Sequence, residues 1–290
     1  MPRRSYSDTF ARVGRALDGE PGEVCVGVTF VPDEAILSLA WGSPAGDPLL
    51  TAVCSRLSPD FAFVESWADQ AAALCEAVAG CGTVPFWVVR GPLDHAASVT
   101  GWSETIAATV RKATALAPLL DEGVEAARAS VRDAGACGAG AVVIAEDVAG
   151  AEGPLAAPDF VLGELLPRYG AICRTAAEEG LPVIWHSDGD TRAFLEAAAR
   201  EGLRGLHPGG LGPEPFRHLF TRARQEGLVV LGGVPGWALR AGTIPALKAA
   251  SSASLIARSG GLLVCDDGGV STGEELGSLI TALQAVRGDV

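Results

Sequence analysis

The chain has 290 residues, of which 48% are hydrophobic and 20% charged, so it can bury a large core and does not belong to the disordered class. Its formal net charge is −13, and so acidic a surface repels phosphate groups, which excludes nucleic acid and anionic membranes as expected partners. The longest apolar runs are strand-sized, far shorter than a membrane span. Arginines near the start have no apolar segment behind them, which predicts a cytoplasmic protein without a signal peptide.

The predicted elements begin with an amphipathic helix over residues 1–20 and then alternate between apolar runs and helical segments. The runs are apolar throughout, as parallel strands covered on both faces require, and they lie at 24–30, 61–66, 84–90, 140–146, 182–187, 204–207, 228–233 and 261–266. Helices are predicted at 66–80, 159–180, 191–202, 213–227 and 243–260, and a helix pair, 104–120 with 122–135, fills the long third connection. Thr272 and Glu275 form a capping box that begins a last helix over 273–287.

This alternation of strands and helices favours one (β/α)8 TIM barrel that occupies residues 1–290 as a single domain. An open doubly wound sheet is the competing α/β fold, but no G-x-G-x-x-G follows the first strand. The seven cysteines are scattered and never form C-x-x-C, so we expect small buried side chains and neither a disulfide framework nor a zinc knuckle.

Polar residues stand where the predicted strands end, which is where barrels of this class gather their chemistry. Histidines and carboxylates that converge on one mouth can bind a divalent metal, or can supply an acid of raised pKa together with a base. A single carboxylate such as Asp188 could equally cap the following helix, so the set carries the prediction. The set consists of Glu65, Trp67, Arg90, Glu146, Asp147, His186, Asp188, His207 and Asp267.

The second half of the chain resembles the uroporphyrinogen decarboxylase superfamily. Residues 141–172, with an acidic pair, a glycine and a proline-led helix, are similar to its fourth-strand segment, and PVIWHSDGD at 182–190 is similar to its fifth. The stretches 203–210, 228–243 and 260–276 follow in the family's order, whereas the first 140 residues match only through 84–96. The resemblance implies a barrel with a deep central cleft, in a superfamily where homodimers are common.

The superfamily includes porphyrinogen decarboxylases and corrinoid-dependent methyltransferases. Resemblance to the decarboxylases implies an aspartate shortly after the second strand, where this chain has Trp67, and several cations for substrate carboxylates, of which only Arg90 is clear. Resemblance to the thiol methyltransferases implies an H-x-C zinc site and a further cysteine near the eighth strand. His186 matches that histidine, but Asp188 and Gly268 stand at the cysteine positions.

The resemblance therefore implies a methyltransferase that moves a methyl group between a small-molecule donor and a corrinoid on a separate carrier protein. The zinc ligands would be His186, Asp188 and either Glu146 or Asp267, a harder set than thiolates. We expect Glu146, Asp147 and Asp188 to be catalytic, and the substrate contacts to be Glu65, Trp67, Arg90, His207 and Asp267. Two alternatives stay open: a decarboxylase-like lyase on a different substrate, and a non-catalytic ligand-binding barrel.

Overall fold

A computed structural model describes residues 5–39, 49–68, 70–111, 113–150 and 152–287. One sheet has eight strands in the order β1-β2-β3-β4-β7-β8-β9-β10, and the fold is that of a (β/α)8 TIM barrel, as the sequence predicts. The strands are β1 Gly27–Val28, β2 Phe61–Glu65, β3 Val84–Arg90, β4 Ala141–Ala145, β7 Val183–Asp188, β8 Gly205–Gly209, β9 Val229–Val234 and β10 Leu262–Asp266. Val26 forms a parallel bridge with Val264, so the first strand segment lies beside the last strand.

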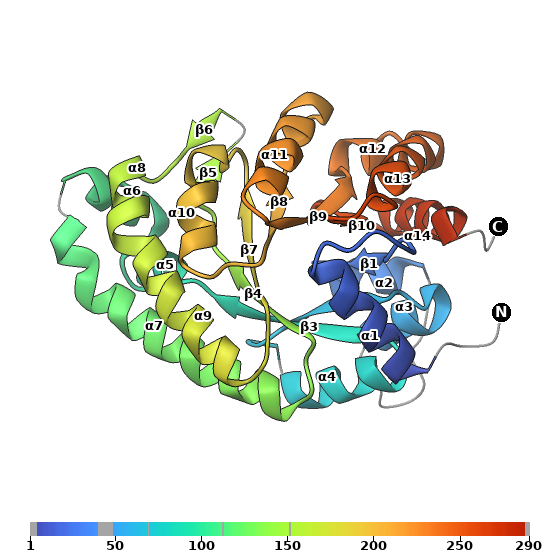
Figure 1. Ribbon diagram of the computed structural model, residues 1–290, viewed down its shortest axis with the longest axis horizontal. Coiled ribbons are helices and arrows are strands. Elements are labelled where there is room, and N and C mark those ends of the chain that lie inside the picture. The colour runs from blue at the N-terminus through green and yellow to red at the C-terminus, as the bar shows by residue number, and fades with distance from the viewer. Residues whose placement is uncertain (1–4, 40–48, 69, 112, 151, 288–290) are drawn as a thin grey trace. The chain divides into compact units, whose positions relative to one another are not determined.

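The chain separates into two compact units (Figure 1). The first, called the terminal unit, comprises Met1–Val64, Ala68–Phe86 and Val229–Val290, and the second, called the central unit, comprises Glu65–Trp67 and Trp87–Leu228. The expectation of a single domain over residues 1–290 stays a prediction. The amino-terminal helix is observed as α1 Tyr6–Leu17, and the first residues of the predicted range lie outside the described residues.

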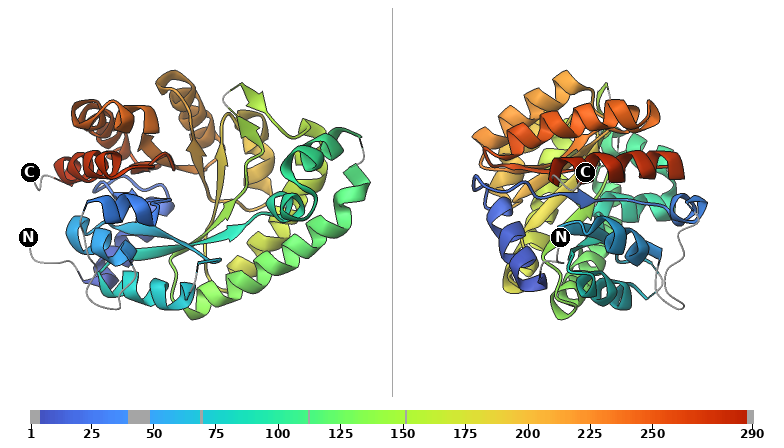
Figure 2. Two further views of the ribbon diagram at one scale, coloured as in Figure 1. Left: turned by 180° about the vertical axis from the view of Figure 1, so that it is seen from behind. Right: turned by 90° about the vertical axis from the view of Figure 1, so that its right-hand side faces the viewer.

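The helices of the terminal unit come from two parts of the sequence, one before and one after the residues Trp87–Leu228 of the central unit. α13 and α14 pack side by side (Figure 2), and Glu275 donates its backbone N–H to the Thr272 hydroxyl at 3.3 Å, which confirms the predicted cap of α14. The Glu275 carboxylate accepts from the Ser271 N–H at 2.7 Å. The helices are α1, α2 Asp33–Ser38, α3 Leu49–Leu57, α4 Ala71–Gly80, α12 Gly236–Arg240, α13 Thr243–Ala257 and α14 Gly273–Arg287.

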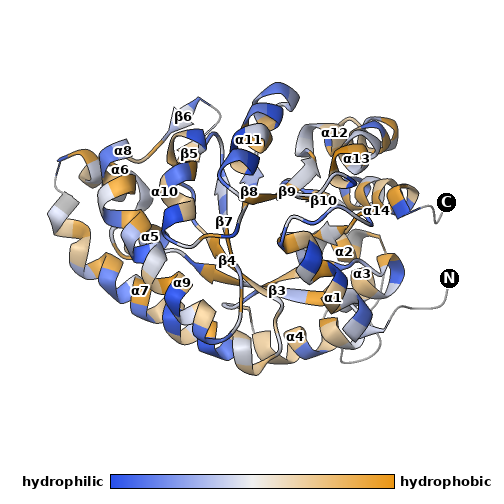
Figure 3. Ribbon diagram, viewed as in Figure 1, coloured by the Kyte–Doolittle hydropathy of each residue, from blue (hydrophilic) through white to orange (hydrophobic). Residues whose placement is uncertain are grey.

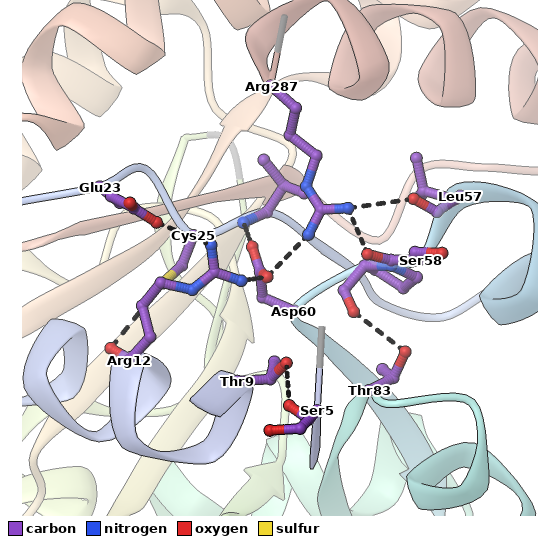
Figure 4. Close-up of polar contacts among 12 residues, drawn as sticks. Ser5, Thr9, Arg12, Glu23, Cys25, Leu57, Ser58, Asp60, Thr83 and Arg287 are labelled. Atoms are coloured by element: carbon purple, nitrogen blue, oxygen red, sulfur yellow. Dashed lines mark hydrogen bonds and ion pairs between the residues drawn. The ribbon is translucent and has the colours of Figure 1, made fainter. Parts of the chain in front are cut away.

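A buried ion cluster, called the Asp60 cluster, stabilises the terminal unit. Arg12 of α1 and Arg287 of α14 both pair with the Asp60 carboxylate (Figure 4), and the Arg287–Asp60 contact is 2.7 Å long. The same carboxylate accepts the Val26 N–H at 2.7 Å. Only 1% of the Asp60 side chain is exposed, so its charge needs these partners, and the cluster ties both end helices to the loop before β2.

The central unit holds the helices and the small hairpin that follow β3, β4, β7 and β8. α7 packs against α9, and the two run side by side in Figure 1. These elements are α5 Pro92–Thr100, α6 Trp102–Arg111, α7 Ala113–Ala136, β5 Ala149–Gly150 with β6 Gly153–Pro154, α8 Pro158–Phe160, a π-helical turn Val161–Leu165, α9 Leu166–Glu178, a 3-10 turn Arg192–Phe194, α10 Leu195–Arg200 and α11 Pro213–Gln225.

The boundary predicted between the two helices of the long connection is wrong. The helix does not break at Asp121 but runs unbroken from Ala113 to Ala136, and a further helix, α5, precedes α6. Buried residues recur at helical spacing through the expected break, so the acids at 121 and 122 lie on the exposed face; the buried positions include Leu116, Leu120, Val124, Ala127 and Val131. Figure 3 shows this mixture of hydrophobic and hydrophilic residues along α7.

Five of the seven cysteines are buried, which agrees with the expectation of small core side chains. No helix within the described ranges is long and apolar enough to cross a membrane.

Candidate metal and substrate site

Strand register in the central unit decides which polar side chains meet at the ends of β4, β7 and β8. β4 pairs with β7 so that Ala145 lies opposite His186, and β7 pairs with β8 so that His186 lies opposite His207. Residues opposite each other in a parallel pair project to the same face, and residues two apart on one strand share that face. His186, Asp188 and His207 therefore share one side of the sheet.

The segment after β4 is joined to β7 by three hydrogen bonds. Glu146 N–H donates to the His186 carbonyl at 3.0 Å, Val148 N–H to the Ser187 hydroxyl at 3.1 Å, and Asp188 N–H to Asp147 Oδ1 at 2.7 Å. The last bond orients the Asp147 carboxylate toward the end of β7. These bonds place Asp147 beside Asp188.

Asp147, His186 and Asp188 bring one potential ligand atom each to a single point, and we call them the acid–histidine trio. The three atoms lie within 4.8 Å of one another. His186 is buried, Asp147 is half-buried and Asp188 is exposed, so the trio is open on the Asp188 side. A metal site with one accessible side is the form found in catalytic centres, because a substrate atom can enter the coordination sphere.

His207 orients His186 from the neighbouring strand. The two rings lie 4.9 Å apart, and His186 Nδ1 is 3.0 Å from the His207 carbonyl oxygen and 2.9 Å from His207 Nδ1. A carbonyl only accepts, so the geometry favours a proton on His186 Nδ1 and a lone pair on Nε2. Histidines that bind metals commonly donate their second N–H to such a carbonyl. His207 is fully buried and lies against His186, and its expected substrate contact stays a prediction.

Glu146 does not join the trio; the structure brings Asp147 there in its place. Its carboxylate accepts the backbone N–H groups of Leu93 and Asp94 at the start of α5 and pairs with the Tyr169 hydroxyl of α9. Complete burial raises the pKa of Glu146 to about 8, although these hydrogen bonds act in the opposite direction. Glu146 thus caps α5 from the segment after β4, and a side chain on Gly91 would collide with it.

Trp67 and Arg90 form a second polar feature, at the ends of β2 and β3. The Arg90 guanidinium lies over the Trp67 ring, 4.9 Å from its centroid, and is 3.9 Å from the Asp94 carboxylate. Both side chains are exposed, so this stacked pair can contact a ligand. Partial burial raises the pKa of Asp94. Glu65 ends β2 and is half-buried.

Asp267 belongs to the terminal unit, where its Oδ1 accepts the Gly236 N–H at the start of α12 at 2.9 Å. Its neighbour Asp266 accepts from the Thr29 N–H at 3.0 Å and from the Thr29 hydroxyl, and burial raises its pKa to about 6. The expected substrate contact of Asp267 stays a prediction.

Two residues of this region were not predicted from the sequence, Tyr169 and Asp94. Tyr169 lies inside a helix, and no linear pattern relates it to Glu146. Asp94 has a weak signal, because it stands four residues after Arg90 at the beginning of a helix where acids are favoured.

Comparison with solved structures supports the fold. A methyltransferase from Methanosarcina mazei is similar over 97% of this chain and 98% of its own, with a TM-score of 0.67 and 16% identity. A xylose isomerase domain protein from Planctomyces limnophilus is similar over 92% of this chain and 98% of its own, with a TM-score of 0.55 and 15% identity. No family model matches the chain, and no curated protein matches it. At these identities the likeness shows the barrel fold alone.

Proposed function

We propose that this protein is a methyltransferase whose acid–histidine trio binds a zinc ion. The observation that carries the proposal is the convergence of Asp147, His186 and Asp188 within 4.8 Å at the carboxyl ends of neighbouring strands. The full-length likeness to a methyltransferase fold supports the reaction class. The proposal also follows the superfamily resemblance of residues 140–290.

The trio fits a zinc ion in distance and in charge. Ligand atoms at about 2.0–2.2 Å from zinc lie no more than about 4.4 Å apart, so only small side-chain rotations separate the trio from a coordinating geometry. Two carboxylates and a neutral imidazole would balance a divalent cation, and burial limits the negative charge that Glu146 adds because it raises the pKa of Glu146 to about 8. The His207 carbonyl holds the imidazole in the tautomer that offers Nε2.

The bound zinc would supply Lewis acidity toward the oxygen or nitrogen that carries the methyl group. In the overall transfer the heteroatom–methyl bond breaks, the heteroatom keeps the electron pair and takes up a proton, and the acceptor forms the new bond to carbon. Asp147, His186 and Asp188 would hold the zinc where the donor's heteroatom can reach it. Trp67 and Arg90 would contact the rest of the donor.

The acceptor that we propose is a reduced corrinoid on a separate carrier protein, as the superfamily resemblance implies. The sequence has no D-x-H-x-x-G corrinoid motif of its own. A homodimer is likewise a proposal that rests on the resemblance.

Zinc content and zinc affinity test the proposal before any substrate is known. We expect about one zinc per chain in protein purified without chelators, and a loss of affinity of at least ~100-fold in His186→Ala and Asp188→Asn. His218→Ala is the matched control, because His218 is exposed on α11 and should leave zinc binding unchanged. Elemental analysis and calorimetric titration would measure both quantities.

Activity then tests the reaction class with methoxy and methylamine donors and a reduced corrinoid. Methyl transfer that requires zinc and His186 would support the whole proposal. A wild-type protein that binds no zinc, or variants that bind it as well as wild type, would overturn the metal-assisted mechanism. Zinc binding without transfer to the corrinoid would overturn the methyltransferase and favour the ligand-binding barrel.

A further inference from the structure

A hollow of about 520 Å³ lies in the central unit, outside the acid–histidine trio. Pro154 of β6, Asp190 and Arg192 after β7, and His218 and Arg222 of α11 line it. Its volume is within the range of sites for small ligands, about 300–1,000 Å³. No residue of the hollow takes part in the mechanism above, and two arginines and a histidine line it beside one carboxylate.

The walls of the hollow are held in place by backbone contacts. Asp190 N–H donates to the Gly150 carbonyl at 3.3 Å, which joins the β5–β6 hairpin to the loop after β7. Gly189 has φ +83°, and a Cβ there would lie 2.2 Å from the Gly150 carbonyl oxygen, so the close approach requires a glycine. α11 packs against the 3-10 turn that carries Arg192. Three separate elements therefore present their side chains to one hollow.

Acidic neighbours hold both arginines in fixed orientations. Arg192 donates through Nε and Nη2 to the Asp190 carboxylate at 2.5–3.0 Å, and Arg222 Nη2 lies 2.8 Å from the Glu226 carboxylate. A guanidinium has five N–H donors, so each arginine has donors beyond those that its acid accepts. The two side chains remain 41% and 45% exposed, and His218 is 52% exposed. The donors are oriented in advance but still open to a ligand.

We infer that this hollow binds the anionic group, a carboxylate or a phosphate, of a small-molecule substrate. Two forked guanidiniums and an imidazole match the planar carboxylate or the phosphate, both of which accept paired N–H donors. Asp190 is two residues beyond Asp188, at most ~7 Å along the chain, so one small molecule can reach from the trio to the hollow. The assignment to the substrate rests on the proposed function, whereas anion binding itself does not.

Calorimetric titration of the full chain with inorganic phosphate and with succinate, at constant ionic strength, tests this inference. We expect saturable binding of at least one anion, weakened roughly tenfold or more in the double variant Arg192→Gln/Arg222→Gln. Arg217→Gln is the matched control, because Arg217 also lies on α11 and also pairs with an acid, but does not line the hollow. The preferred anion identifies the acidic group.

Absence of binding to wild type, or equal binding by the double variant, would overturn the inference. The titration is repeated on His186→Ala so that the two proposals can fail separately. Anion binding that is retained there while zinc is lost places the anion in the hollow and not on the metal. Anion binding that disappears with His186 would also overturn the inference, because the anion would then bind at the trio. If wild type binds no zinc but binds the anion through both arginines, the anion site in the hollow is supported and the metal-assisted methyl-transfer mechanism is overturned.

Discussion

Two groups of carboxylates in this protein have opposite surroundings. In the Asp60 cluster one buried carboxylate is held by two arginines and a backbone N–H. In the acid–histidine trio two carboxylates lie with a histidine, and one of the carboxylates is exposed. The first arrangement compensates the charge within the protein, so it stabilises the fold. The second gathers negative charge where a cation can reach it, so it suits binding.

A further carboxylate, Glu146, is fully buried among neutral donors. Its partners are two backbone N–H groups and a tyrosine hydroxyl. Neutral donors offset burial less well than arginines do, so the pKa of Glu146 is raised to about 8. Burial alone does not decide what an acid does, because the charge of its partners decides whether it ionises.

The largest effect is expected from Asp60→Asn. This change leaves Arg12, which is 8% exposed, without a charged partner in the core, and it should lower the free energy of unfolding by about 3–5 kcal/mol. Urea unfolding measures the change. Glu23→Gln is the control, because Glu23 pairs with Arg12 from an exposed position and should cost less than about 1 kcal/mol. Equal losses of unfolding free energy in the two variants would show that the Asp60 cluster does not have the stabilising role described above.

An intermediate effect is expected from Glu146→Gln, and it depends on pH. Between the ordinary pKa of 4.5 and the folded-state pKa of about 8, the folded protein keeps a proton that the unfolded chain releases. The free energy of unfolding therefore falls as pH rises through this window, by up to about 1.4 kcal/mol per pH unit. Glutamine keeps one oxygen that can accept the two backbone N–H groups, and its NH2 group can donate to the Tyr169 oxygen. It cannot ionise, so the variant should lose this slope.

Unfolding midpoints measured from pH 5 to pH 8 would show the difference. Glu125→Gln serves as the reference, because Glu125 is exposed and pairs with Arg128 on the same helix. A wild-type slope that survives in Glu146→Gln would show that another group titrates in this window.

The smallest effect on stability is expected from Asp188→Asn in zinc-free protein. Removing one of two neighbouring carboxylates relieves repulsion, so the free energy of unfolding should change by less than about 1 kcal/mol or rise slightly. The same urea titration measures it, beside the loss of zinc affinity proposed above. If Asp188→Asn lowered the free energy of unfolding as much as Asp60→Asn does, the trio would stabilise the fold just as the Asp60 cluster does.

The sequence by itself determined the class of fold and the places where polar residues gather. All eight apolar runs became strands of the sheet, because a parallel strand covered on both faces must be apolar along its length. The same uniformity explains why His186, Asp188 and the acidic pair could be located at strand ends. It also hides which face each residue takes, since a strand that is apolar throughout carries no alternation to read.

Only the tertiary structure decided which residues share the site. Glu146 and Asp147 are neighbours, and successive side chains of an extended segment point to opposite faces, so one lies with Tyr169 and the other joins His186 and Asp188. The register between β4 and β7 makes this choice, and register is a property of two strands rather than of one. The hollow of Arg192 and Arg222 has the same origin, because its walls are three elements that only folding brings together.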